Sequence, residues 1–116
     1  MGLEMVLQGE PGPHSDIWYS ARTRVINIHQ GTPEGAVYIG HDGYFGNPIS
    51  LADHTDRENV LERYAHYLSK RLEVDPIFCA RVKLLSGRTL ACFCIPRLCH
   101  GMLLAEKADE LYTNAN

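Results

Sequence analysis

The chain lacks any long hydrophobic run, since no apolar stretch approaches the roughly 20 residues that a helix needs to cross a bilayer. Its N-terminus also lacks the basic stretch followed by an apolar one that begins a secretion signal. These two absences predict a cytoplasmic protein with no membrane contact. Positive charge is not in excess either, because 11 Lys and Arg face 14 Asp and Glu, a net charge of −3. This balance disfavours a nonspecific nucleic-acid binder, whose basic face usually dominates.

The chain has four cysteines, but its N-terminus shows no export signal, and disulfides form mainly in exported proteins. Three of them, Cys92, Cys94 and Cys99, fall within eight positions. Cys92 and Cys94 share one face of a predicted strand and are poorly placed to bond each other. Reduced thiols, metal ligands or a catalytic thiol therefore fit this cluster better than disulfides do.

No internal repeat, low-complexity tract or domain boundary divides the 116 residues, which suit one small domain with a modest core. Pro11, Gly12 and Pro13 interrupt the first stretch. We therefore expect an irregular N-terminal arm over residues 1–20 and a single α/β domain over residues 21–116.

Hydrophobic periodicity predicts three strands and three helices. The strands are expected at 24–29, 36–40 and 89–95. The first two would pair antiparallel if they are neighbours, because their connection is too short for a crossover. Both faces of the third strand are apolar, so it should be central. The second and third strands can run parallel, because two helices connect them.

The helices are expected to begin near Thr55, where Thr55 and Glu58 form a capping box, at Asp75 with Pro76 in its first turn, and at Cys99. Gly87 should end the second helix, with Ile77, Phe78, Val82, Leu84 and Leu85 on its buried side. Together the elements predict a small Rossmann-like layered sandwich of three to four strands and about three helices.

The site is expected beyond the carboxyl ends of the parallel strands. The second strand leads into residues 41–48 and the third into residues 96–101, so these loops should lie side by side. The ligand-binding residues predicted from the two loops are Gly40, Gly46, Asn47, Pro48, Cys94, Arg97 and Gly101.

The start of the last helix suggests the class of ligand. Its unpaired N–H groups favour an anion, Gly101 allows close backbone approach, and Arg97 can hold a phosphate or carboxylate. The same field would stabilise a thiolate at Cys99. We therefore expect a small anionic ligand, such as a nucleotide or a phosphorylated sugar, which Asn47, Arg97 and His100 would orient.

Two mechanisms remain open at this point. In the first, Cys99 is a nucleophile, with His100 or His41 as its proton-transfer partner. His41 is the better placed of the two, because adjacent helical residues diverge by about 100°. In the second, a C-x-C-x4-C-H set binds zinc, and its ligands are Cys92, Cys94, Cys99 and His100. Cys92 and Cys94 can instead be small buried apolar residues.

The motifs VYIGHDGYFGNPIS and LSGRTLACFCIPRLCHGMLL, with a helix containing Glu62, Arg63 and Tyr64 between them, resemble the domain of unknown function 4326 family of bacteriophages and bacteria. The resemblance covers about residues 24–111 and implies no activity. It does imply that the Gly-Asn-Pro loop and the Cys-x-Cys-x-Pro, Cys-His segment belong to one signature. The chain departs from the family pattern at His41, where Arg is usual, and at Phe45, where Trp is usual.

These observations give two functional hypotheses. The first is a small cytoplasmic enzyme or binding domain that acts on a nucleotide-type anionic ligand at the Cys/His site facing the Gly-Asn-Pro loop. The alternative is a zinc-binding interaction module, a phage accessory factor that binds a host protein. A phage-encoded protein of either kind would act in the cytoplasm of its bacterial host.

Overall fold

A computed structural model describes residues 9–11, 17–28, 33–40, 44–46, 57–92 and 100–114. Within them the chain forms an α/β domain with three helices and a five-stranded mixed sheet, which confirms the predicted fold class. The strands are β1 (Glu10–Pro11), β2 (Ile17–Tyr19), β3 (Arg24–Asn27), β4 (Val37–Tyr38) and β5 (Thr89–Cys92). The helices are α1 (Arg57–Val74), α2 (Pro76–Lys83) and α3 (His100–Asn114).

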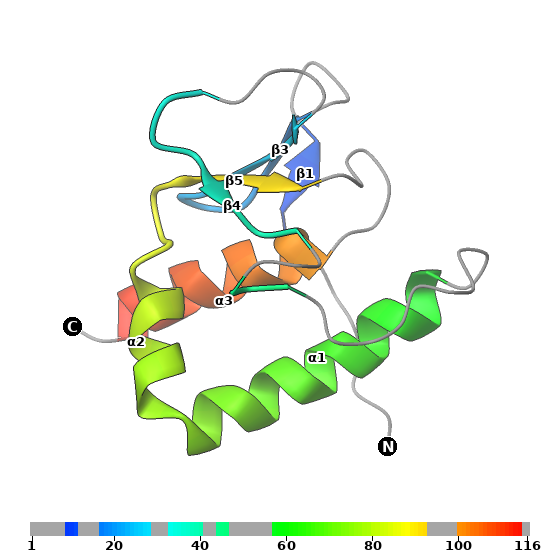
Figure 1. The fold of residues 1–116 in the computed structure, drawn as a ribbon, viewed down its shortest axis with the longest axis vertical. Coiled ribbons are helices and arrows are strands. Elements are labelled where there is room, and N and C mark those ends of the chain that lie inside the picture. Colours follow the sequence, from blue (N-terminus) through cyan, green and yellow to red (C-terminus); the bar gives the residue numbers. More distant parts are fainter. Residues whose placement is uncertain are drawn as a thin grey trace.

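The sheet has the strand order β1-β2-β3-β5-β4, and its last three strands run parallel (Figure 1). β5 lies between β3 and β4, as the apolar character of both its faces predicts. Leu90, Ala91 and Cys92 are all buried. The parallel pairing of β4 with β5 is therefore confirmed, and with it the topology on which the expected site depends.

The antiparallel pairing expected of the first two predicted strands if they were neighbours does not arise. β3 and β4 are not neighbours; they flank β5 and run in the same direction. The physical reason is their shortness. β3 has four residues and β4 two, so the chain has to return only about 13 Å along the strand direction before starting again.

The sheet begins earlier than the sequence pattern indicates. Ile17–Tyr19, inside the stretch expected to be irregular, forms β2 and pairs antiparallel with β3. Trp18 lies opposite Val25 and is buried in the core. A three-residue strand is too short to show a period. The edge position of β1 accommodates Pro11, because an edge strand has one side without ladder bonds.

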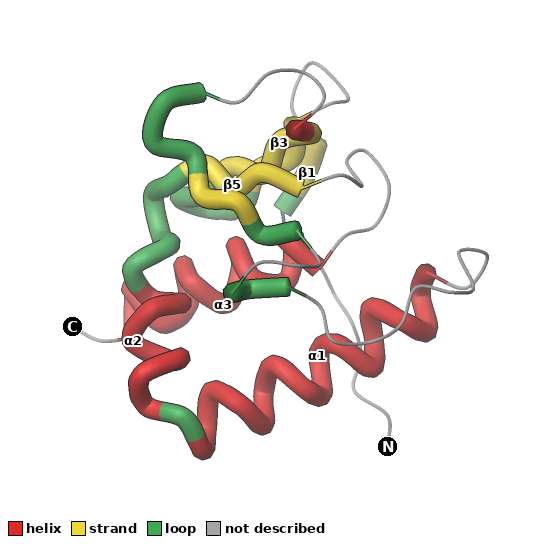
Figure 2. Tube along the Cα trace, in the orientation of Figure 1, coloured by secondary structure: helices red, strands yellow, loops and turns green. Residues whose placement is uncertain are grey.

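All three helices lie on one side of the sheet, below it in Figure 1. The finer expectation of a Rossmann-like arrangement is therefore not confirmed, because that fold covers both faces with helices. α3 packs directly on β3 and β5, while α1 and α2 pack on α3 (Figure 2). Among the described residues, no helix is long and apolar enough to span a membrane.

α2 confirms the predicted cap and corrects part of the predicted buried face. The Asp75 carboxylate accepts a hydrogen bond from the Phe78 N–H at 3.0 Å, and Pro76 occupies the first turn. Phe78, Val82 and Leu85 are buried as expected. Ile77 and Leu84 were assigned to the same side, yet both side chains are exposed. The apolar residues of this short helix occupy two faces, and the sequence does not show which face turns inward.

Candidate functional site

A buried histidine joins the two segments that the sequence places at the site. His100, the first residue of α3, donates a hydrogen bond from Nε2 to the Ile39 carbonyl oxygen at 2.6 Å. Ile39 directly follows β4 and lies 61 positions earlier in the chain. The start of α3 therefore meets the end of β4 at His100 and Ile39, whereas most of the two predicted loops, 41–48 and 96–101, lies outside the described residues.

The hydrogen bond also determines which ring nitrogen carries the proton. A carbonyl oxygen only accepts, so His100 Nε2 must carry a hydrogen. In the neutral ring, Nδ1 then holds the lone pair, and only this atom can take up a proton or bind a metal. The His100 ring packs edge-on against the buried Tyr64 ring of α1, with 5.3 Å between centroids. His100 thus ties together β4, α1 and α3.

Three predicted ligand-binding glycines fall within the described residues. Gly40 is buried, and the Tyr38 ring occupies the space that a β-carbon at position 40 would need. Packing of Tyr38 therefore accounts for this glycine without a ligand. Gly101 is buried in the first turn of α3, and Gly46 is half-buried beside Phe45. Their predicted contacts with a ligand stay predictions.

Two aromatic residues attach the loop after β4 to α2. The Tyr44 and Phe45 rings make an edge-to-face contact at 4.9 Å, and each lies about 6 Å from the Phe78 ring. Phe45 packs against the core, whereas Tyr44 remains exposed. Residues 44–46 are therefore held against the α1–α2 corner, which is formed by Arg71, Asp75 and Phe78.

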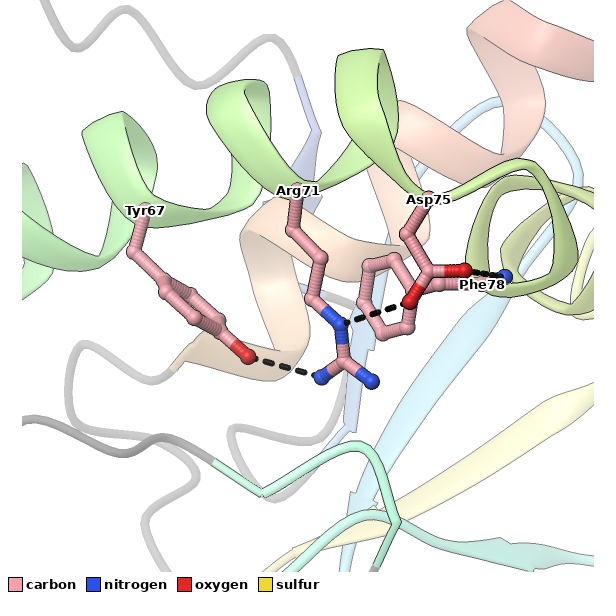
Figure 3. Close-up of polar contacts among 4 residues, drawn as sticks. All are labelled: Tyr67, Arg71, Asp75 and Phe78. Carbon is pink, nitrogen blue, oxygen red and sulfur yellow. Dashed lines mark hydrogen bonds and ion pairs between the residues drawn. The ribbon is translucent and has the colours of Figure 1, made fainter.

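Arg71 is held at this corner by three contacts (Figure 3). Its Nη1 donates to the Tyr67 hydroxyl at 2.7 Å, its Nε lies 3.6 Å from the Asp75 carboxylate, and its guanidinium stacks over the Phe78 ring at 3.9 Å. Partial burial lowers the pKa of Arg71, but the hydrogen bond from Arg71 to Tyr67 and the charges of Tyr67, Tyr44 and Asp75 outweigh it, so the pKa is raised. The predictions from sequence do not single out Arg71. The available signal was the spacing of four residues between Tyr67, Arg71 and Asp75.

Asp109 is a second polar centre that the sequence interpretation missed. Its buried carboxylate accepts hydrogen bonds from Ser20 Oγ, from the Arg22 N–H at 2.8 Å, and from Thr23 Oγ1 and Ser86 Oγ at 2.7 Å each. Burial raises the pKa of Asp109, but these four donors outweigh it and leave the pKa lowered. An acidic residue beside Ala108 in the buried stripe of α3 was the available signal.

The Asp109 cluster belongs to the structure of the domain more than to the site. It lies nine residues after His100, about 13 Å farther along α3. Its donors come from the β2–β3 turn and from the turn before β5, so it fixes the position of α3 beneath the sheet.

Six of the predicted site residues lie outside the described residues: His41, Asn47, Pro48, Cys94, Arg97 and Cys99. The pairing of Cys99 with His41 and the anion-binding role of Arg97 therefore stay predictions. The capping box at Thr55 and the strand residues 93–95 also fall outside the described part of the chain.

Two features of the described residues weigh against the zinc hypothesis. Cys92 is 1% exposed and packs within the hydrophobic core. His100 uses Nε2 to bind the Ile39 carbonyl, so a metal would have to bind Nδ1. Over the described ranges no group of three or more His, Cys, Asp or Glu is placed to hold a metal ion. The predicted zinc set also needs Cys94 and Cys99, which are not among those ranges.

Comparison with known proteins connects this site to a family. The family model "Domain of unknown function (DUF4326)" matches residues 25–110, which include every predicted site residue. The chain is also similar to the "Uncharacterized 12.4 kDa protein in nrdA-td intergenic region" of Enterobacteria phage T4. The two are 30% identical over 87 residues, which cover 75% of this chain and 69% of the phage protein. No solved structure matches. With its fold, its signature segments and a family match over most of its length, the chain belongs to the DUF4326 family.

Proposed function

We propose that this protein binds a small anionic ligand of the nucleotide or nucleoside type, between residues 40–48 and the start of α3. The observation that supports this proposal most directly is the hydrogen bond from His100 to the Ile39 carbonyl. It brings the start of a 15-residue helix to the carboxyl end of a parallel strand. Ligands of α/β proteins bind at that edge of the sheet.

The residue types that we propose for this site suit an anion. The first N–H groups of α3 carry the positive end of the helix dipole, and Arg97 adds a permanent charge. Asn47 supplies an amide that can hydrogen-bond a base or sugar. In the enzymatic form of the proposal, the dipole stabilises a Cys99 thiolate, and His41 or His100 Nδ1 exchanges the proton. Nucleotides are cytoplasmic metabolites, so we propose that the protein acts in the cytoplasm, of the bacterial host if it is phage-encoded.

A zinc-stabilised module that binds a host protein is the second candidate, and the described residues favour it less. Its four ligands include a thiol packed in the core and a histidine that already donates Nε2 to a backbone carbonyl. Elemental analysis of the purified protein separates the two proposals. Stoichiometric zinc with unfolding by a chelator would support the module, and metal-free folded protein would remove it.

The ligand proposal is tested by thermal unfolding in the presence of nucleotides, nucleosides, sugar phosphates and inorganic phosphate. A ligand at about 100 times its Kd stabilises the folded state by about 2.7 kcal/mol. For a domain of this size that raises Tm by roughly 10 °C. We expect such a shift with at least one nucleotide-type compound and a much smaller one in Arg97→Ala.

Arg63→Ala is the matched control, because Arg63 is exposed on α1 and its loss changes the net charge equally. This variant should keep the full shift. The proposal is wrong if no compound raises Tm, or if Arg97→Ala and Arg63→Ala respond alike to the compound that does. Loss of turnover but not of binding in Cys99→Ala would further assign the thiol to catalysis.

A further inference from the structure

Exposed apolar side chains gather around α2, from its junction with α1 to its C-terminal end. Among the described residues, five large apolar or aromatic side chains are exposed, and four of them lie here: Tyr44 (45% exposed), Val74 (61%), Ile77 (64%) and Leu84 (72%). The fifth, Tyr112, is covered on its ring face by Arg22 at 3.9 Å. Single exposed apolar residues are normal, but a cluster of them marks an interaction site.

α2 carries apolar side chains on its outer face as well as its inner one. Ile77, Ala80 and Leu84 are three and four positions apart, so they form one row, the α2 stripe, within about 60° around the helix axis. Phe78, Val82 and Leu85 fill the opposite, buried side. A surface helix normally has a polar outer face. Packing within the domain therefore does not account for the apolar α2 stripe. α2 lies at the periphery of the molecule (Figure 1).

Positive charge flanks this stripe on both sides. By the helical angles, Arg81 and Lys83 border the α2 stripe on either edge, and both are exposed. Residues 70–88 hold five basic and two acidic side chains, a net charge of +3, in a chain whose total is −3. One of the two acids, Asp75, is engaged with the Phe78 N–H and Arg71. Residues 70–88 thus form a basic stretch on an otherwise acidic protein.

Tyr44 extends this surface onto the loop after β4. The Arg81 guanidinium lies 4.7 Å from the Tyr44 ring centre, and the Arg71 guanidinium lies 5.5 Å from it. Tyrosine and arginine are the residue types most enriched at the energetic centre of protein interfaces, together with tryptophan. Here Arg81 borders the α2 stripe and contacts Tyr44, and Arg71 is fixed by its contacts to Tyr67 and Asp75 (Figure 3).

We propose that the α2 stripe, with Arg81, Lys83 and Tyr44, is the docking surface for an acidic segment of a partner protein that presents apolar side chains at helical spacing. Charge complementarity selects this occupant, because a basic rim repels a basic segment and attracts an acidic one. The apolar row then supplies the anchors, as in the binding of an amphipathic helix to a groove or face. The surface shares only Tyr44 with residues 40–48 of the proposed ligand site, and either can exist without the other.

The test is selection of a random library of displayed 16-residue peptides on the immobilised full chain. We expect the selected peptides to be enriched in Asp and Glu and to carry Leu, Ile or Phe at positions three and four apart. Synthetic versions of the selected peptides, measured by fluorescence anisotropy, should bind Ile77→Ser/Leu84→Ser and Arg81→Glu/Lys83→Glu at least about tenfold more weakly than wild type.

The double variant Arg24→Glu/Arg63→Glu makes the same change of net charge at exposed positions of β3 and α1, outside residues 70–88, and should bind within about threefold of wild type. Circular dichroism checks that each variant remains folded, and all substituted side chains are exposed. The proposal fails if no peptide is selected, if the selected peptides lack an acidic excess, or if the control weakens binding as much as Arg81→Glu/Lys83→Glu. It also fails if sedimentation shows a dimer that Ile77→Ser/Leu84→Ser dissociates, since the occupant would then be a second copy.

Discussion

At the scale of single residues, two buried side chains connect parts of the chain that are far apart. His100 joins α3 to the end of β4, and Asp109 joins α3 to the turns before β3 and β5. In the described part of the chain, every buried side-chain nitrogen or oxygen has a hydrogen-bond partner. Removing either residue would therefore leave a partner unsatisfied in the interior, which costs more than the lost bond itself.

Replacement of His100 by Phe should destabilise the protein. A phenyl ring keeps the contact with Tyr64 but cannot donate to the Ile39 carbonyl. We expect a loss of about 1–3 kcal/mol in the free energy of unfolding, measured in urea. His66→Phe, at an exposed position of α1, should change stability by less than about 0.5 kcal/mol. Equal stabilities for the two variants would show that the His100 hydrogen bond contributes nothing.

Asp109 should make the free energy of unfolding depend on pH in the acid range. Its pKa is lowered in the folded protein, so the ionised carboxylate stabilises the fold above its unfolded pKa of about 3.9. This contribution is lost as the pH falls through the lower folded value. We expect urea midpoints of the wild type to decline below about pH 4 more steeply than those of Asp109→Asn. At neutral pH the variant should be less stable, because an amide nitrogen cannot accept the donated hydrogens. Parallel pH profiles would contradict this role.

At the scale of elements, the α1–α2 corner depends on Asp75. Its carboxylate caps α2 through the Phe78 N–H and pairs with Arg71, and the Phe78 hydrogen bond is the largest cause of its lowered pKa. The cap is therefore strongest above the acid range and weakens as the pH falls through the folded pKa.

Two substitutions separate the two contacts of Asp75. Asn is as good an N-cap as Asp but carries no charge, whereas Ala removes both contacts. We expect Asp75→Ala to lower the urea midpoint and Asp75→Asn to leave it nearly unchanged, since an exposed ion pair contributes little. If Asp75→Asn is as unstable as Asp75→Ala, the charge on Arg71 matters more than the cap.

At the scale of the whole molecule, the sequence predicted the elements that are long enough to show a hydrophobic periodicity. It also predicted that the end of β4 and the start of α3 lie at the carboxyl edge of the parallel strands. The loops that follow parallel strands leave at the same edge of the sheet, and this rule is sufficient to predict that residues 39–40 lie near the start of α3. It gave no sign of the His100 hydrogen bond itself, since a first helical residue can point in several directions. β2 and the Asp109 cluster were missed because each depends on partners distant in the chain. The exposed positions of Ile77 and Leu84 were missed because periodicity does not identify the inner face.

β2 makes the first part of the chain essential to the fold. Trp18 lies within the core, opposite Val25 of β3. We expect Trp18→Ala to cost about 3–5 kcal/mol, because a large cavity would open beneath the sheet. Trp18→Phe should cost markedly less, since it keeps an aromatic ring there. Near-wild-type unfolding midpoints for Trp18→Ala would mean that β2 is not part of the cooperative unit.

The central claim is that the segment after β4 and the start of α3 form one ligand site. The most direct measurement is the backbone amide NMR spectrum of the labelled protein, titrated with the nucleotide that raises Tm most. We predict that the largest shifts occur at Gly40, Gly46, His100 and Gly101, two segments that lie far apart in the sequence and meet at one edge of the sheet. Shifts concentrated on α2 or on β1 and β2, or an unchanged spectrum at millimolar ligand, would contradict the claim.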